Sequence, residues 1–177
     1  MQRILKFLIP VFIAIFLSGT VHAQLVPLPK ALLFGNIGLA SPSNDVFKNQ
    51  YKNGLALEVG AGLGLGKTIL TGSIGYQLYS SKYLLVPQGS NNLKIVPVKV
   101  GIRRYLIGKL FLMGNAGIAY QSYEHTTGGN SFLYELGAGI KVVKMIELQL
   151  STNGWKQPGA SSYSNALLFK AGWSIKI

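Results

Sequence analysis

His125 is the centre of the only segment whose side chains could form a catalytic group of hydrolase type. It is the one histidine outside residues 1–23, and Ser122, Glu124 and Ser131 are close to it in the sequence. An imidazole can act as a general base at neutral pH, and with a serine and a carboxylate it could form a hydrolytic triad. Residues adjacent on an extended chain point in different directions, however. The spacing therefore favours a loop histidine without a catalytic role, and we predict no catalytic residue.

A second segment, residues 61–68 (AGLGLGKT), formally fits a loose phosphate-binding loop. Such a loop joins a strand to a helix, because the helix N-terminus receives the phosphates. The sequence after Thr68 alternates apolar and polar residues as a strand does. We therefore interpret Gly66-Lys67 as a tight turn between two strands, with the other glycines on one crowded face.

Metal and cofactor sites are not indicated. The sequence has no cysteine, which excludes thiolate ligands and a disulfide scaffold. Glu124 and His125 alone are too few ligands for a metal ion. We predict neither a metal nor a cofactor.

Residues 1–23 have the features of a secretory signal peptide. Two basic residues precede an apolar run over residues 7–17, and small residues lead to a cleavage site after Ala23. The run is interrupted by Pro10 and is shorter than the roughly 20 residues of a membrane-spanning helix. We predict cleavage after Ala23, which leaves residues 24–177 as one exported domain.

The rest of the sequence alternates apolar with polar or glycine residues in about eight segments. The clearest spans residues 94–104, where valine or isoleucine occupies every second position from 96 to 102. This period is typical of strands that cross a bilayer, which have about 9–11 residues. The other segments span residues 30–40, 55–65, 68–80, 110–121, 131–142, 145–153 and 165–177. Segment 30–40 fits poorly, because Leu32, Leu33 and Phe34 are consecutive. The pattern predicts an all-β, eight-stranded antiparallel up-and-down transmembrane barrel.

Short and long connections alternate along the chain. Short turns are predicted at residues 66–67, 107–109 and 143–144, and longer polar connections at 41–53, 81–92, 122–130 and 154–164. Outer-membrane barrels have short periplasmic turns and longer extracellular loops. This order fixes the direction of each strand and places Tyr76, Tyr120 and Tyr134 outward near the long connections. We predict an aromatic girdle that contains these residues and the outward-facing Trp173.

Seven charged residues fall on the inward faces of the predicted strands. They are Glu58, Lys99, Arg103, Glu135, Lys141, Glu147 and Lys170. An unpaired charge in a confined interior is costly, and an eight-stranded barrel is narrow enough for side chains to fill it. We predict a plugged lumen with an ion-pair network. A charged conduction path is the alternative.

A soluble barrel of lipocalin type would have its apolar face inward. Its outer face would then be the one with glycine, alanine and a few charges, which is too sparse for a solvated exterior. The mean hydropathy of +0.33 also favours a lipid-facing barrel.

The basic composition bears on the partners. A net charge of +12 could suit nucleic acid, but an exported chain meets lipopolysaccharide phosphates and anionic sugars instead. The longer connections are basic through Lys48, Lys52, Lys82 and Lys156. This suits lipopolysaccharide or an acidic surface partner, with the contacts made by the loops Asp45–Tyr51 and Lys156–Tyr163. We predict no nucleic-acid partner.

Six stretches resemble the small outer-membrane β-barrel domain family of Gram-negative bacteria, of the OmpA/OmpX-like type. They are Gly35–Phe47, Tyr51–Leu55, Gly72–Tyr76, Val96–Leu106, Gly114–Ala119 and Phe169–Ile177. The resemblance covers nearly all of residues 24–177. It implies insertion by the outer-membrane assembly machinery and, for most members, no assigned biochemical activity.

Together these observations predict a small, non-enzymatic integral protein of the Gram-negative outer membrane with a structural or surface-interaction role. Three alternatives remain open at this point. They are a lipid A hydrolase that uses His125, a soluble lipocalin-like binding barrel and a narrow channel.

Overall fold

The computed structural model of the chain describes residues 30–82, 92–123, 128–156 and 162–177. The strands are β1 (Lys30–Pro42), β2 (Gly54–Leu65), β3 (Thr68–Tyr79), β4 (Leu93–Tyr105), β5 (Leu110–Tyr123), β6 (Gly129–Lys141), β7 (Ile146–Lys156) and β8 (Tyr163–Lys176). One short helix, α2 (Asp45–Gln50), lies between β1 and β2. The predicted leader and His125 lie outside the described residues.

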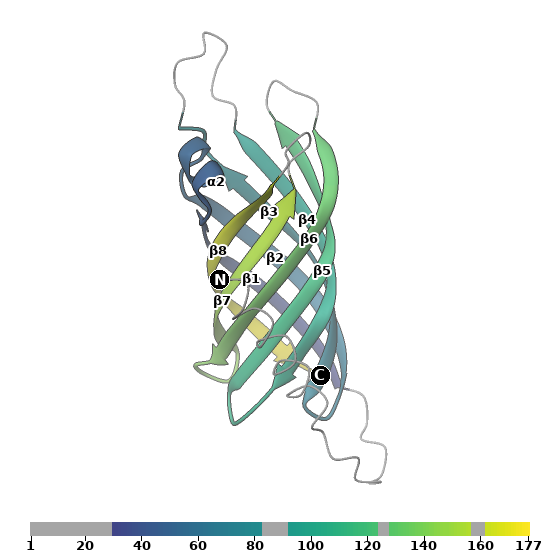
Figure 1. Cartoon of the computed structure of the whole chain (residues 1–177). Helices are drawn as coiled ribbons and strands as arrows, with labels where there is room; N and C mark the ends of the chain where they lie inside the picture. Colours follow the sequence, from purple (N-terminus) through teal and green to yellow (C-terminus); the bar gives the residue numbers. More distant parts are fainter. Residues whose placement is uncertain (1–29, 83–91, 124–127, 157–161) are drawn as a thin grey trace, which may run out of the picture.

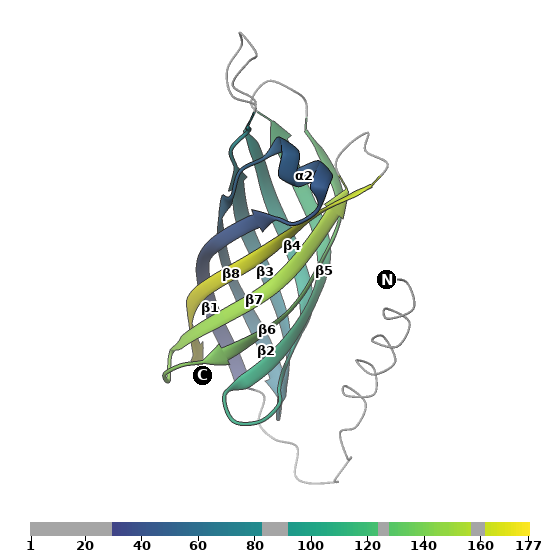
Figure 2. The same cartoon turned by 60° about the vertical axis from the view of Figure 1, so that its left-hand side comes forward.

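The strands form one closed antiparallel barrel in sequence order, and β1 pairs with both β2 and β8. Figures 1 and 2 show the tilted strands, with α2 at one end and the short turns at the other. Closure pairs every strand on both sides, which removes the open edges that a flat sheet would expose. The predicted eight-stranded antiparallel barrel is confirmed.

The segment that resembles a phosphate-binding loop is a hairpin. β2 ends at Leu65 and β3 begins at Thr68, so no helix follows the glycines. Gly66 has a positive φ of 62°, a backbone conformation that glycine adopts without strain. The predicted turn at Gly66-Lys67 is confirmed.

Side chains alternate along each strand, so that most apolar ones point outward and most charged ones point inward. On β4, Val98, Val100 and Ile102 are exposed, whereas Lys99 and Arg103 are buried. A soluble lipocalin-like barrel requires the opposite arrangement, so the distribution argues against that alternative. No helix in the described part of the chain is long and apolar enough to cross a membrane.

The poor fit of segment 30–40 has a structural reason. β1 is a regular strand in which Leu32 and Phe34 face the lumen while Leu33 faces outward. Apolar residues occupy both faces because this end of the lumen is itself apolar.

Candidate functional site

The middle of the lumen contains a four-residue ion-pair network. Glu58 on β2 lies 2.7 Å from the Nζ atoms of both Lys99 and Lys170, and Glu135 on β6 lies 2.7 Å from Lys170 Nζ. Glu135 also pairs with Lys99. Each carboxylate accepts one further hydrogen bond, Glu58 from Ser73 and Glu135 from Ser151. Two acids and two bases thus neutralise each other in a buried space.

A second ion pair lies nearer the short turns. Arg103 Nη1 donates to Glu147 Oε1 and Oε2 at 3.0 and 3.1 Å. The guanidinium also lies 4.9 Å from the ring centroid of Phe34 and 4.4 Å from that of Phe111, so that aromatic faces cover the cation. Gln149 donates to Glu147 and connects the pair to Asn36.

Six of the seven predicted lumen charges therefore meet in these two groups. Lys141 does not join them: it stands opposite Glu147 across β6 and β7, but Glu147 is engaged by Arg103 and Gln149. No ion pair within the described ranges includes Lys141, and it lies half-buried at the short-turn mouth of the barrel.

An aromatic layer closes the opposite mouth, and the sequence did not predict it. Phe47 of α2 is fully buried, and its ring lies 5.0 Å from that of Tyr79 and 5.2 Å from that of Trp155, both edge-on. Tyr51, which follows α2, packs 5.1 Å from Phe47. Burial raises the pKa of the Tyr51 hydroxyl to about 12, with a smaller contribution from Tyr123, so this layer is neutral at physiological pH.

The contact role predicted for the loop Asp45–Tyr51 stays a prediction, but this packing limits which of its side chains could reach a partner. Phe47 and Tyr51 point into the barrel, and only the remaining α2 side chains are available to a partner. The signal was two aromatic residues, Phe47 and Tyr51, in a mostly polar stretch, which is too little to predict a helix from hydrophobic periodicity.

A third layer fills the lumen near the short turns. Its members are Leu32, Phe34, Ile69, Tyr105, Phe111 and Met113. Glycines on neighbouring strands make room for its rings: a Cβ atom at Gly60 would lie 2.8 Å from Cε1 of Phe34, and one at Gly139 would lie 2.7 Å from Cε2 of Phe111. Side chains thus occupy the lumen from one mouth to the other.

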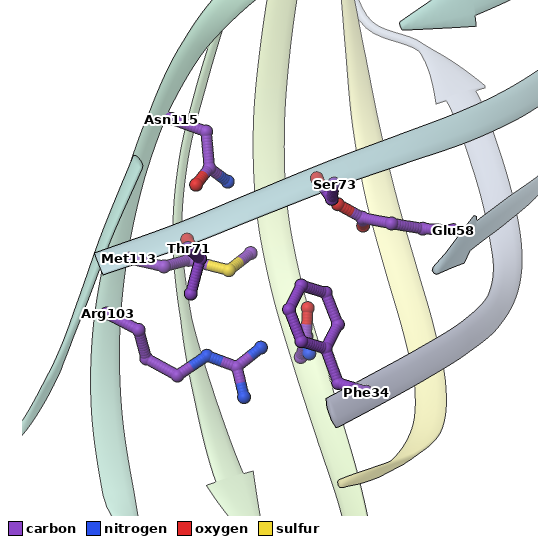
Figure 3. A pocket seen from close by; sticks show the side chains of 8 residues that line it. Phe34, Glu58, Thr71, Ser73, Arg103, Met113 and Asn115 are labelled. Carbon is purple, nitrogen blue, oxygen red and sulfur yellow. The ribbon is translucent and has the colours of Figure 1, made fainter. Parts of the chain in front are cut away.

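Between the ionic and apolar layers there is a small cavity of about 10 Å³. Its walls include Phe34, Glu58, Arg103 and Asn115, which Figure 3 shows converging from several strands. A cavity of that size is at the lower limit for a single water molecule. The cavity is too small for a substrate or for an ion-conduction path.

The predicted girdle residues lie on the outer wall. Tyr76 and Tyr120 are exposed and lie near the ends of β3 and β5 at the long connections. Tyr134 is half-buried, and its hydroxyl donates to Asn165 Oδ1 at 3.1 Å. Trp173 pairs with Ile146, the first residue of β7, and therefore lies at the opposite end of the barrel from Tyr76 and Tyr120.

Of the residues near His125 in the sequence, the structure describes the two serines but neither Glu124 nor His125. Ser122 is exposed, whereas Ser131 is half-buried and accepts a hydrogen bond from the buried Gln121. The two serines point to opposite faces of the barrel wall. Among the described residues, no group of three metal-ligating side chains occurs.

No family model and no curated protein sequence matches the chain. Solved structures do match it. Ail of Yersinia pestis, in complex with the heparin analogue sucrose octasulfate, is 14% identical with a TM-score of 0.53 and covers 83% of this chain and 98% of its own. Neisserial surface protein A is 11% identical with a TM-score of 0.53, and the match covers 83% of this chain and 97% of that protein. The N-terminal β-barrel domain of Pseudomonas aeruginosa OprF is 13% identical with a TM-score of 0.54, and the match covers 82% of this chain and 97% of that domain.

At these identities the likeness establishes the fold alone. The chain has the fold of the small eight-stranded outer-membrane β-barrels, as the sequence predicts.

Proposed function

We propose that this chain is a non-enzymatic integral protein of the outer membrane whose role is structural or adhesive and is carried by the ends of the barrel. The observation that supports this most directly is the filled lumen. An aromatic layer, an ion-pair layer and an apolar layer follow one another, and the cavity between the last two holds about 10 Å³. Such a lumen leaves little room for a conduction path or for a bound substrate.

The outer wall supports the membrane location. Its exposed side chains include leucine, isoleucine and valine on all eight strands or at their ends. An apolar exterior of this extent suits lipid, because exposed apolar patches on soluble monomers are much smaller. By analogy with outer-membrane barrels, the short turns face the periplasm and α2 faces outward.

We assign contact with a surface partner to three lysines, Lys48, Lys52 and Lys82, which we name the α2 lysines. Lys82 Nζ donates to the Lys48 carbonyl at 2.6 Å, and the Lys82 and Lys52 amides bond to Gln50 and Ser80. These contacts bring the end of β3 beside α2 and gather the three exposed cations on one side of the mouth. The patch suits an anionic saccharide, either in lipopolysaccharide or on another surface.

The complex of Ail with a sulfated saccharide gives a probe for this proposal. We expect the folded barrel to bind sucrose octasulfate, and the triple variant Lys48→Gln/Lys52→Gln/Lys82→Gln to bind it about tenfold more weakly, since each exposed ion pair contributes up to about 1 kcal/mol. Isothermal titration of the detergent-solubilised barrel measures this. The matched control is Lys67→Gln/Lys109→Gln/Lys144→Gln at the opposite end. Equal affinity of both triple variants and the wild type would refute the assignment of the α2 lysines.

A further inference from the structure

Among the described residues, the short-turn end of the barrel has many more basic than acidic side chains. Six basic residues lie there, on the turns or at strand ends, and we name them the short-turn rim: Lys30, Lys67, Lys109, Lys141, Lys144 and Lys176. The sequence has five acidic residues in all. Glu58 and Glu135 belong to the central network and Asp45 to α2, whereas Glu124 lies outside the described residues. Glu147 is the remaining acid, and Arg103 and Gln149 occupy it.

Several of the cations at the short-turn end lie close to one another. Lys30 and Lys176 lie on paired strands, where Leu32 stands opposite Lys176. Lys141, Lys30 and Arg103 lie close enough to repel Lys176 and Glu147 close enough to attract it, and its ammonium group lies 3.7 Å from the ring centroid of Tyr105. Like charges gathered in this way attract anions from the surroundings.

Exposed apolar side chains alternate with these cations. Ile107 precedes Lys109 in its turn and is 86% exposed, and Val143 and Met145 flank Lys144 with about half of their surfaces exposed. Ile177 follows Lys176 and is also exposed. Apolar side chains beside lysines are typical of a membrane interface, where the apolar part enters the bilayer and the ammonium group stays with the headgroups.

The distribution of the cations indicates lipid instead of one compact ligand. The three turns that contribute Lys67, Lys109 and Lys144 follow one another around the barrel, and Figures 1 and 2 show them at the lower end from two sides. A single soluble anion would contact one part of such a ring. Lipids that surround the barrel would contact all of it.

We propose that the short-turn rim binds the phosphate groups of anionic phospholipids in the leaflet that surrounds it, and so anchors this end of the barrel at the membrane surface. The proposal rests on the membrane-spanning barrel of the proposed function. It assigns Lys67, Lys109 and Lys144 to headgroup contact, because their positions in the turns place them at the boundary of the apolar wall. Lys109 Nζ donates one hydrogen bond there, to the Val142 carbonyl at 3.1 Å, and keeps its other donors for a phosphate. Lys30, Lys141 and Lys176 surround the mouth.

Native mass spectrometry tests this proposal. The barrel is produced from the full-length chain and measured in detergent, with equal amounts of phosphatidylglycerol and phosphatidylethanolamine added. We expect the wild type to retain phosphatidylglycerol about fivefold over phosphatidylethanolamine, since basic residues near the surface attract anionic lipid. Lys67→Gln/Lys109→Gln/Lys144→Gln should bring the ratio close to one, whereas Lys48→Gln/Lys52→Gln/Lys82→Gln should leave it unchanged.

Three results would overturn the proposal. They are a wild type without lipid preference, a preference lost only in the α2-lysine variant, and displacement of the lipid by an equal concentration of glycerol 3-phosphate, which would indicate a site for soluble anions. A gel run with and without boiling on the same samples shows whether each variant is a folded barrel. A variant that does not fold as a barrel is thereby distinguished from a folded barrel that does not select anionic lipid.

Discussion

Replacing Glu135 with glutamine will destabilise the folded barrel by about 3–5 kcal/mol, the cost of removing one partner from a buried ion pair. Glu135 is fully buried and pairs with both Lys99 and Lys170. Without its charge, Glu58 alone would have to neutralise two ammonium groups in a space closed at both ends. Denaturant unfolding of the barrel in lipid vesicles, followed by tryptophan fluorescence, measures the loss.

A double variant separates charge balance from packing. Glu135→Gln/Lys170→Met restores a one-to-one ratio of acids to bases in the network and should recover most of the lost stability. Asp45→Asn removes an exposed carboxylate on α2 and should change the stability by less than about 0.5 kcal/mol. If Glu135→Gln costs less than about 1 kcal/mol, a value within the range for exposed pairs, the network is not the buried one described here.

The second large effect is expected at Phe47. Phe47→Ala should cost about 3–5 kcal/mol, because it removes a fully buried ring from the aromatic layer and leaves a cavity. Loss of this ring also detaches α2 from the mouth, so trypsin should cleave after Lys48 faster than in the wild type. Unfolding and limited proteolysis of the same preparation give both values.

Val46→Ala is the matched control, since Val46 lies on the same helix but is 57% exposed. It should change the stability by less than about 0.5 kcal/mol and leave the cleavage rate as it is. Indistinguishable behaviour of the Val46 and Phe47 variants would show that α2 does not close the mouth.

Alternation along the sequence was sufficient to predict the strands, the short turns and the inward face of the seven charged residues assigned to the lumen. This follows from the period of two, because a strand buried on one side repeats its chemistry at every second residue. Segment 30–40 was ambiguous for the same reason: Leu32 and Phe34 face an apolar part of the lumen, which alternation alone does not distinguish from lipid.

The pairing inside the lumen could not be predicted. The face of Lys141 follows from its position in the strand, but which acid it meets depends on the register of several strands around the closed barrel. Arg103 is placed against Glu147 by that register, which leaves Lys141 at the mouth. The role of Phe47 also depends on tertiary structure, because a six-residue helix is too short to show a hydrophobic period.

The most direct test of a closed membrane barrel is heat-modifiability of the protein in isolated outer membranes. We would produce the full-length chain in a Gram-negative host, isolate the outer membrane, and compare its migration on a denaturing gel with and without boiling. The account predicts an outer-membrane band that migrates differently before and after boiling, because the paired strands resist detergent until they are heated. A periplasmic band that does not shift would contradict it.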